Sequence, residues 1–398
     1  MLYFFILGHN SILSIAEILA RLKKGGKNVE KFSPDVLILK DSSIHPSSLQ
    51  DKLGGTVKIG EIIARASLEK TEKILPYIFR YFPKNAKKIY FGFSIYRLEE
   101  GTSLAKAYCK TKILALKIKK ALKEKGISSR WVTCRKFSLS SVVVRKNRLS
   151  LPDQGIEFVL LIGKDKFYLG KSLSWQDFEK EKHFDFGRPK RPIKQGLLPP
   201  KLARILINLS QTPKNETLLD PFCGAGTILS EEIRMGYKNI IGADISSLAL
   251  KQTEENLKWL QKQIKEKINY RLILSDVRNI SKKIPSLSVG AIITEPYLGP
   301  IKPPKSKSSV SNLISNLSEL YLAAFKEFKI ILKPKGRVVI IFPVFAFQKK
   351  KLLLRDKIKK QGWKIINPLQ KLPYLQNQPL IYQQPEQKIL REILILQK

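Results

Sequence analysis

The sequence predicts an α/β protein whose C-terminal half is a Rossmann-like domain, with a mostly parallel seven-stranded sheet closed by an antiparallel hairpin. Strand-like and helix-like segments alternate over residues 198–398, which is typical of a parallel sheet with helices on both faces. A strand, a glycine-rich turn and a helix start follow one another at residues 216–235, as in nucleotide-binding corners. The 398 residues, 43% of them hydrophobic, suffice for two or three domain cores.

Residues 1–55 have the pattern of a small α+β region. The expected elements are a strand at Tyr3–Leu7, a helix at Ser11–Leu22, a strand at Val36–Leu39 and a short helix after Pro46. The hydroxyl of Ser11 can cap its helix, and the apolar residues of that helix recur on one face. Nothing in this region has a catalytic pattern.

Residues 56–172 continue the α+β pattern. A long helix at Ser103–Lys125 is expected to end at Gly126, since glycine is common just past a helix C-terminus. Its apolar positions include Leu104, Ala107, Ile113, Leu114, Leu116, Ile118, Ala121 and Leu122. The other expected elements are a helix at Thr71–Phe82 and strands at Lys88–Ser94, Arg130–Cys134, Ser141–Arg145, Glu157–Ile162 and Phe167–Gly170.

Basic residues exceed acidic ones throughout the chain. The formal charge is +40, from 73 Lys and Arg against 33 Asp and Glu. Residues 101–150 hold 14 basic residues and a single acid, Glu124. Such a field attracts polyanions, and the block favours a surface that follows the phosphate backbone of a nucleic acid. The alternatives are a lysine-rich composition and an ordinary solvated helix face.

Cysteine and histidine are sparse and scattered. Cys109, Cys134 and Cys223 have neither metal-ligand spacing nor a disulfide pattern, and the three histidines, His9, His45 and His183, are just as scattered. We therefore expect no metal site and a reducing, cytoplasmic location. The apolar N-terminus lacks a basic lead and reads as a strand, not a signal peptide, and no apolar run is long enough to span a bilayer.

A linker is expected at residues 173–197. Aromatic residues alternate with charges up to Phe186 and should anchor the segment onto a domain, and two prolines and a glycine then block regular structure. A helix follows to Leu209. The remaining expected elements are a strand ending at Asp220, a helix at Ile228–Met235, strands at Asn239–Ala243, Tyr270–Leu274, Val289–Thr294 and Arg337–Phe342, a mobile basic loop at Lys302–Ser311, and a hairpin of residues 379–383 and 388–396.

Four consecutive predicted strands end in a carboxylate: Asp220, Asp244, Asp276 and Glu295. In open α/β sheets the carboxyl ends of the strands form the ligand site. The separation of Asp244 from the glycine corner suits a ribose-binding acid. Asp276 can accept from an adenine amine, with the Val277 N–H pairing to a ring nitrogen, and Asp220 suits an ammonium. Ribose, adenine and a cationic tail describe S-adenosylmethionine; a nicotinamide dinucleotide competes, but its phosphates would be repelled by Asp220.

The stretch Glu295-Pro296-Tyr297 predicts a pocket for a planar amine. The carboxylate and the Pro296 carbonyl can accept hydrogen bonds from an exocyclic amino group, and Tyr297 can stack on the base. Accepting those N–H groups as the nitrogen pyramidalises favours its attack on a sulfonium methyl, mostly through alignment. The alternative is a loop with a structural Pro-Tyr.

These two stretches carry a family resemblance. Asp-Pro-Phe-Cys-Gly-Ala-Gly-Thr at 220–227, with Glu-Pro-Tyr at 295–297, resembles the amino-methyltransferase branch of Rossmann-like, S-adenosylmethionine-dependent enzymes. With the lead-in Leu198–Arg204 and the basic region upstream, the chain is similar to THUMP-domain RNA methyltransferases, and most of all to the group that makes N2-methylguanosine at position 10 of tRNA.

The resemblance implies domains and site residues. It implies a ferredoxin-like region at 1–55 and a THUMP-like RNA-binding domain at 56–172, which grip tRNA, then a linker at 173–197 and a methyltransferase domain at 198–398. The implied cofactor-binding residues are Asp220, Phe222, Gly224, Gly226, Thr227, Asp244, Ile245, Asp276 and Val277. The implied catalytic residues are Glu295, Pro296 and Tyr297.

One departure from the family pattern concerns the acceptor stretch. The family has Asp or Asn followed by Pro-Pro-Tyr, whereas this chain has a longer acid, Glu295, and one proline fewer. Three functions therefore stay open: a tRNA guanine-N2 methyltransferase, a DNA or ribosomal-RNA amino methyltransferase, and a catalytically degenerate RNA-binding protein. The absence of a recognition-helix pattern favours RNA over DNA.

Overall fold

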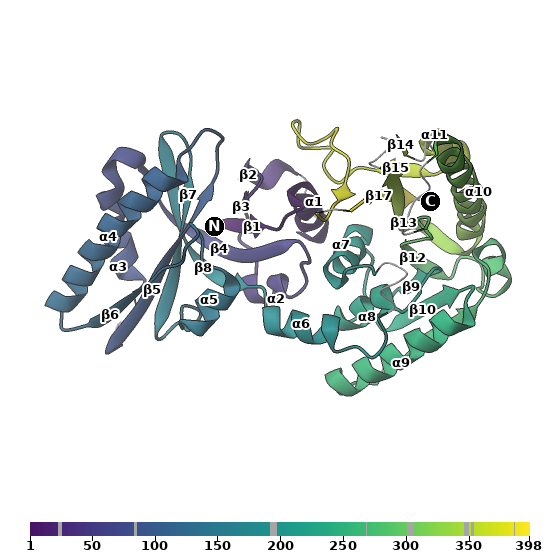
Figure 1. The fold of residues 1–398 in the computed structure, drawn as a ribbon, viewed down its shortest axis with the longest axis horizontal. Coiled ribbons are helices and arrows are strands. Elements are labelled where there is room, and N and C mark those ends of the chain that lie inside the picture. Colours follow the sequence, from purple (N-terminus) through teal and green to yellow (C-terminus); the bar gives the residue numbers. More distant parts are fainter. Residues whose placement is uncertain are drawn as a thin grey trace. The chain divides into compact units, whose positions relative to one another are not determined.

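The computed structural model describes residues 1–22, 26–82, 86–191, 197–267, 269–300, 306–345, 350–351, 354–385 and 387–398. The chain forms two compact units (Figure 1). The N-terminal unit comprises residues 1–11, 27–52 and 56–181, and the C-terminal unit comprises 12–26, 53–55 and 182–398. The first helix therefore belongs to the C-terminal unit, although the strands on either side of it belong to the other.

The N-terminal unit is built on one eight-stranded sheet of order β2-β3-β1-β4-β8-β7-β5-β6. Neighbours are antiparallel, except that β5 is parallel to both β6 and β7. The strands are β1 (Leu2–Leu7), β2 (Val29–Phe32), β3 (Val36–Lys40), β4 (Thr56–Ser67), β5 (Lys88–Arg97), β6 (Ser128–Val132), β7 (Gly155–Ile162) and β8 (Lys166–Trp175). Strands predicted for 1–55 and for 56–172 thus share one sheet, joined by β4, which the sequence analysis did not predict.

Four helices accompany this sheet in the described residues: α2 (Pro46–Gln50), α3 (Leu75–Arg80), α4 (Leu104–Glu124) and α5 (Ser141–Lys146). Helix α6 (Phe178–Phe186) contains the boundary between the two units, which lies between residues 181 and 182. The buried face of α4 packs on the sheet in a core that includes Leu114, Ile118 and Phe158. Two of its predicted apolar positions, Ile113 and Leu116, are instead exposed.

A charged pair is buried within this unit. The Lys58 ammonium on β4 forms an ion pair with Glu157 on β7, and both side chains are almost fully buried. Lys58 also donates to the Leu139 carbonyl at 2.6 Å, and Glu157 accepts from the Trp175 indole at 2.7 Å. The pair is thus satisfied by further hydrogen bonds, as burial of opposite charges requires.

The predicted strand at Ser141–Arg145 is wrong, because residues 141–146 form helix α5. The three consecutive valines favour a strand. The Ser140 hydroxyl, however, accepts from the Val143 N–H at 3.3 Å and caps a helix. Val144 is then buried beside Val132, Leu139 and Leu149, so the cap and local packing override the β propensity.

Over the part of the chain that the structure describes, the C-terminal unit contains an α/β sheet of nine strands, where seven were predicted, because the short strands β14 and β15 add to the predicted set. Its main path is β11-β10-β9-β12-β13-β17-β15, with β14 and β16 added at β13 and β17. Strands β9 to β13 pair in parallel, and β17 is antiparallel to β13 and β15. The strands are β9 (Thr217–Asp220), β10 (Asn239–Asp244), β11 (Tyr270–Leu274), β12 (Val289–Thr294), β13 (Leu332–Phe345), β14 (Lys350–Lys351), β15 (Lys364–Ile366), β16 (Ile381–Tyr382) and β17 (Ile389–Gln397).

The predicted closing hairpin corresponds to β16 and β17, which pair antiparallel. Strand β15 was not predicted. The helices of this unit are α1 (Ser11–Leu22), α7 (Pro200–Ser210), α8 (Thr227–Arg234), α9 (Ser247–Ile264), α10 (Lys307–Ile331) and α11 (Arg355–Lys360). Helix α10 packs Tyr321, Phe325 and Phe328 against the sheet core. Figure 1 draws α9 below the strands and α10 to their right.

The predicted mobile loop at Lys302–Ser311 is wrong in its second half, because α10 begins at Lys307. The Ser306 hydroxyl accepts from the Ser309 N–H at 3.1 Å and caps that helix. The first half of the predicted loop, up to residue 305, lies outside the described residues.

Candidate active site

The C-terminal unit has a cavity of about 1040 Å³ at the carboxyl ends of its parallel strands. Every predicted site residue except Gly226 lines it. Residues 75 positions apart in sequence, Asp220 and Glu295, therefore meet in one place, as the strand-end pattern predicts. The lining also includes side chains that the sequence analysis did not single out: Arg278, Leu320, Lys388, Ile389 and Arg391.

The glycine corner has the backbone that only glycine adopts easily. Gly224 has φ +52° and Gly226 has φ +77°, in the left-handed region that disfavours side chains. A Cβ at Gly226 would lie 2.8 Å from the Thr253 methyl, so Gly226 is needed for packing beneath the site. A Cβ at Gly224 would meet nothing within 4 Å and would occupy cavity space. Gly224 thus leaves room for a ligand to approach the backbone.

Asp220 lies buried at the end of β9, with 2% of its surface exposed. Its Oδ1 accepts from the Thr294 hydroxyl at 2.7 Å and from the Phe222 N–H at 3.1 Å. Burial raises the pKa of Asp220 to about 7, against the opposing effect of these two hydrogen bonds, and the nearby Asp244 and Glu295 raise it further. A cationic ligand group would suit this carboxyl, because it would stabilise the ionised form.

Asp244 and Asp276 are held in different ways. Each Asp244 oxygen accepts one backbone N–H, from Gly224 and from Ser246, both at 2.9 Å. A carboxylate oxygen has a second lone pair, so Asp244 can still accept from ligand hydroxyls. Asp276 is paired with the Arg278 guanidinium, whose Nε lies 3.0 Å from both carboxylate oxygens. This hydrogen bonding lowers the pKa of Asp276.

The hydrophobic neighbours of these acids differ in exposure. Val277 is buried, whereas Ile245 is 70% exposed at the cavity rim. The Phe222 side chain packs partly against the sheet core. Exposed apolar surface beside a cavity is a common feature of ligand sites.

Glu295 sits at the other side of the cavity, after β12. Its Oε1 accepts from the Arg391 Nε at 2.5 Å, and both side chains are largely buried. The neighbouring Tyr297 has a half-exposed side chain. Its carbonyl accepts from the Tyr321 hydroxyl at 2.8 Å, which fixes the loop against α10. Arg391 follows Glu295 by 96 residues in no recognisable motif, so no sequence signal could have found it.

The linker also reaches this site. Arg188 is buried and donates to the Thr227 hydroxyl at 2.7 Å. The predicted anchoring is confirmed at Phe184, whose ring contacts Trp259 of α9. Residues 192–196 of the predicted linker lie outside the described residues.

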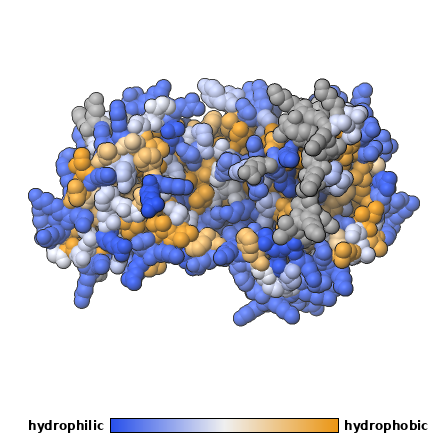
Figure 2. Space-filling model, viewed as in Figure 1, coloured by the Kyte–Doolittle hydropathy of each residue, from blue (hydrophilic) through white to orange (hydrophobic). Residues whose placement is uncertain are grey.

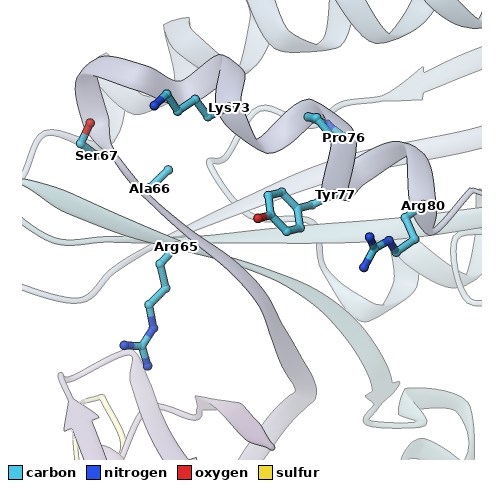
Figure 3. Close-up of a pocket in the computed structure, with 7 residues that line it drawn as sticks. All are labelled: Arg65, Ala66, Ser67, Lys73, Pro76, Tyr77 and Arg80. Atoms are coloured by element: carbon cyan, nitrogen blue, oxygen red, sulfur yellow. The ribbon is translucent and has the colours of Figure 1, made fainter.

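A second hollow lies in the N-terminal unit, with a volume of about 680 Å³ (Figure 3). Its lining includes Arg65, Lys73, Tyr77 and Arg80. It has no acidic or nucleophilic cluster, so it lacks the chemistry of a catalytic site. Across the described residues, no group of three or more His, Cys, Asp or Glu is placed to hold a metal ion, and no helix is both long and apolar enough to cross a membrane.

Two protein families match parts of the chain. Residues 188–364 match the family described as RMKL-like, methyltransferase domain. Residues 81–255 match the family described as DNA methylase. The first range includes the cavity-lining residues from Leu197 to Leu320, and therefore also Glu295.

Curated relatives with tRNA-modifying names match the chain. The tRNA (guanine(10)-N2)-dimethyltransferases of Methanothermobacter thermautotrophicus and Methanocaldococcus jannaschii are 37% and 31% identical over 137 and 205 residues, or 34% and 50% of this chain. These matches span 37% and 52% of the relatives' own length. A probable enzyme of the same name from Methanothermococcus thermolithotrophicus is 34% identical over 30% of this chain and 72% of its own length.

The crystal structure of TrmN from Thermus thermophilus has a similar fold. It covers 100% of both chains with a TM-score of 0.55 at 16% sequence identity.

Proposed function

We propose that this chain, which belongs to the tRNA methyltransferase family of these relatives, transfers a methyl group from S-adenosylmethionine to the exocyclic N2 amine of a guanine in tRNA. One observation carries the proposal: a single cavity brings together the glycine corner, the strand-end acids Asp220, Asp244 and Asp276, and the Glu295–Tyr297 loop. Donor-binding and acceptor-binding groups must meet in this way for direct transfer.

The residues present fit the methyl donor. Asp244 retains lone pairs for the ribose hydroxyls, and the open space at Gly224 allows close approach to the backbone. Asp220 would pair with the amino-acid ammonium. Val277 and Ile245 would flank the adenine, and Asp276 would accept from the adenine amine. Because Arg278 already donates to the Asp276 carboxylate, we assign one remaining lone pair of Asp276 to the adenine amine. When bound, S-adenosylmethionine supplies an electrophilic sulfonium methyl.

The acceptor side needs groups that hold a planar amine. We assign Glu295 and the Pro296 carbonyl as acceptors for the two amine hydrogens, and Tyr297 as the stacking face for the base. Hydrogen bonds to an amine strengthen as its nitrogen loses conjugation with the ring, so they stabilise the transition state more than the ground state.

The N-terminal unit would bind the RNA. Thirteen of the fourteen basic residues in 101–150 are exposed, and Lys110 is partly so. Figure 2 shows hydrophilic surface over the outer end of α4. We assign these side chains to phosphate contacts. The proposal also includes a ferredoxin-like region at 1–55 and a THUMP-like domain at 56–172, which together would grip the tRNA.

Labelled methyl transfer tests the function. Purified protein and methyl-labelled S-adenosylmethionine are incubated with tRNA, ribosomal RNA or plasmid DNA, and the digested nucleosides are identified by mass spectrometry. We expect label only in N2-methylated guanosine from tRNA. The mass of that nucleoside shows directly whether one or two methyl groups were added. Label in ribosomal RNA alone, or no transfer at all, would contradict the proposal.

A DNA amino methyltransferase is the second candidate. The match of residues 81–255 to the DNA methylase family favours it, as does 34% identity over 101 residues to a Vibrio type II methyltransferase, M.VspI. Label in plasmid DNA without label in tRNA would establish this candidate instead.

A further inference from the structure

The acceptor acid of this chain is held by an arginine from the last strand. Glu295 and Arg391 form an ion pair at 2.5 Å, with side chains 15% and 9% exposed, and both line the cavity. Arg391 lies on β17, where it faces Pro343 of β13 and Tyr382 of β16 in register. The sheet therefore fixes the position of the guanidinium.

Other charged and titratable groups surround this pair. Asp220 on β9, Tyr321 on α10 and Tyr382 on β16 all interact electrostatically with Glu295. Lys388 lines the same cavity. Of these groups, Arg391 is the cation in hydrogen-bond contact with Glu295, while Asp220 brings a further acidic group close to it. The Arg391 Nε–H donates to Glu295 Oε1 and thereby fixes the direction of this carboxylate.

An ionised carboxylate accepts hydrogen bonds and donates none. The Watson–Crick edge of guanine presents two neighbouring donors, N1–H and the N2 amine, which match the two oxygens of a carboxylate. Adenine presents its N6 amine beside a bare N1, which is an acceptor. A carboxylate oxygen opposite adenine N1 would place two acceptors against each other with no hydrogen between them. Such an unmatched polar contact is costly in a closed site.

A neutral side chain reverses this preference. A protonated acid or an amide offers one donor and one acceptor, which match an amine beside a bare ring nitrogen. The charge on the acceptor acid therefore decides which base edge fits, independently of the shape of the pocket.

We propose that Arg391 is a specificity-determining positioning residue, which selects guanine as the acceptor by fixing the direction of the Glu295 carboxylate. This inference rests on the proposed function and names the group that restricts its substrate. Arg391 acts through Glu295 and is assigned no contact with the methyl group.

The test compares two acceptor bases with the same N2 amine. tRNA is assembled with guanine or with 2-aminopurine, which lacks the N1 hydrogen, at the position that labelling of the natural tRNA identifies. The ratio of kcat/KM for guanine to that for 2-aminopurine is measured for the wild type and for Glu295→Gln, Arg391→Met and Arg391→Lys. Arg355→Met is the matched control, because Arg355 pairs with Glu392, also on β17, and does not line the cavity.

We expect the wild type to prefer guanine by about 10- to 100-fold, the usual effect of one hydrogen bond to a charged group. Arg391→Lys and Arg355→Met should keep that preference. Glu295→Gln and Arg391→Met should reduce it at least fivefold, while the dissociation constant for S-adenosylmethionine stays within about twofold. A merely structural role of Arg391 would lower thermal stability and leave the base preference unchanged.

Two negative results are distinguishable. If the wild type methylates guanine and Arg391→Met keeps the full preference for it, the inference is wrong and the proposed function stands. A wild type that transfers no methyl to guanine would overturn the proposed function and this inference with it. If Arg391→Met does not fold, Glu295→Gln, nearly isosteric with the native residue, decides the question: an unchanged preference in this variant would equally overturn the inference.

Discussion

At the scale of one residue, the buried Asp220 makes the stability of the protein depend on pH. Its pKa of about 7 in the folded protein compares with an ordinary value of 3.8. The folded state therefore keeps a proton that the unfolded chain releases above about pH 4. The stability that this proton contributes is fully present below pH 4 and is lost as the pH rises through 7, by on the order of 4 kcal/mol.

We predict that Asp220→Asn removes this pH dependence. The amide cannot ionise, and its oxygen can still accept from Thr294 and Phe222. The free energy of unfolding, measured with urea at pH 5 and pH 8, should fall less with pH than in the wild type. Affinity for S-adenosylmethionine should drop at least tenfold, because a neutral amide pairs weakly with an ammonium.

Asp153→Asn, in an exposed position of the N-terminal unit, is the control and should keep the wild-type dependence on pH. Equal pH slopes for Asp220→Asn and the wild type would contradict the assigned titration.

Single residues of the site were predictable where strand order brings them together. The four strand-end acids needed only the rule that parallel strands present their carboxyl ends at one edge. Arg391 and Arg278 were not predictable, because an ion pair depends on side-chain directions that no spacing records. The roles of the predicted residues remain predictions.

At the scale of elements, the buried acid Glu17 of α1 accepts hydrogen bonds from other segments of the C-terminal unit. Both oxygens of Glu17 accept backbone N–H groups, from Gly54 and Gly55 at 2.8 Å, and Oε1 also accepts from the Asn208 amide at 2.7 Å. Burial raises the pKa of Glu17 against these hydrogen bonds. A Cβ at Gly54 would lie 2.1 Å from the Lys201 carbonyl, so α1, the 53–55 segment and α7 pack closely.

We predict that Glu17→Ala destabilises the C-terminal unit by about 2–4 kcal/mol, because buried donors lose their acceptor and a cavity forms. Hydrogen exchange should speed up in α1 and α7 and stay unchanged in β7 of the other unit. Glu30→Ala provides the comparison: it breaks a surface pair with Arg65 and should cost under about 1 kcal/mol. Similar losses in both variants would show that Glu17 does not anchor α1.

Elements were predictable where a local sequence pattern determines the secondary structure. They were not predictable where contacts between distant residues determine it. The bounds of α1 were predicted correctly from its local apolar pattern, although Ser11 is the first residue of the helix and the consecutive residues 13–20 are all buried. Strand β4 was missed: its twelve residues contain Gly60, packed against Phe4 and the Lys171 carbonyl, and only its pairing with β1 and β8 explains it. Helix α5 formed despite its valines because of a cap and a small local core.

At the scale of the whole molecule, the basic excess has two explanations. A lysine-rich composition would spread charge without a binding role, whereas an RNA surface would concentrate it where phosphates lie. A comparison of one helix from each unit distinguishes these explanations, because both helices carry exposed lysines. On α4 they lie at 112, 119 and 120, and on α9 at 251, 258 and 262. Only α4 lies in the block assigned to RNA.

We predict that reversing three charges on α4 weakens tRNA binding more than the same change on α9. Lys112→Glu/Lys119→Glu/Lys120→Glu should raise the tRNA dissociation constant at least tenfold. The slope of log affinity against log salt should fall by about two to three, since each lost phosphate contact removes nearly one unit. Lys251→Glu/Lys258→Glu/Lys262→Glu changes the net charge equally and should alter the slope by less than one. Both variants should bind S-adenosylmethionine normally. Equal loss in the two variants would mean that tRNA responds to net charge alone, and the block at 101–150 would then be composition without a binding surface.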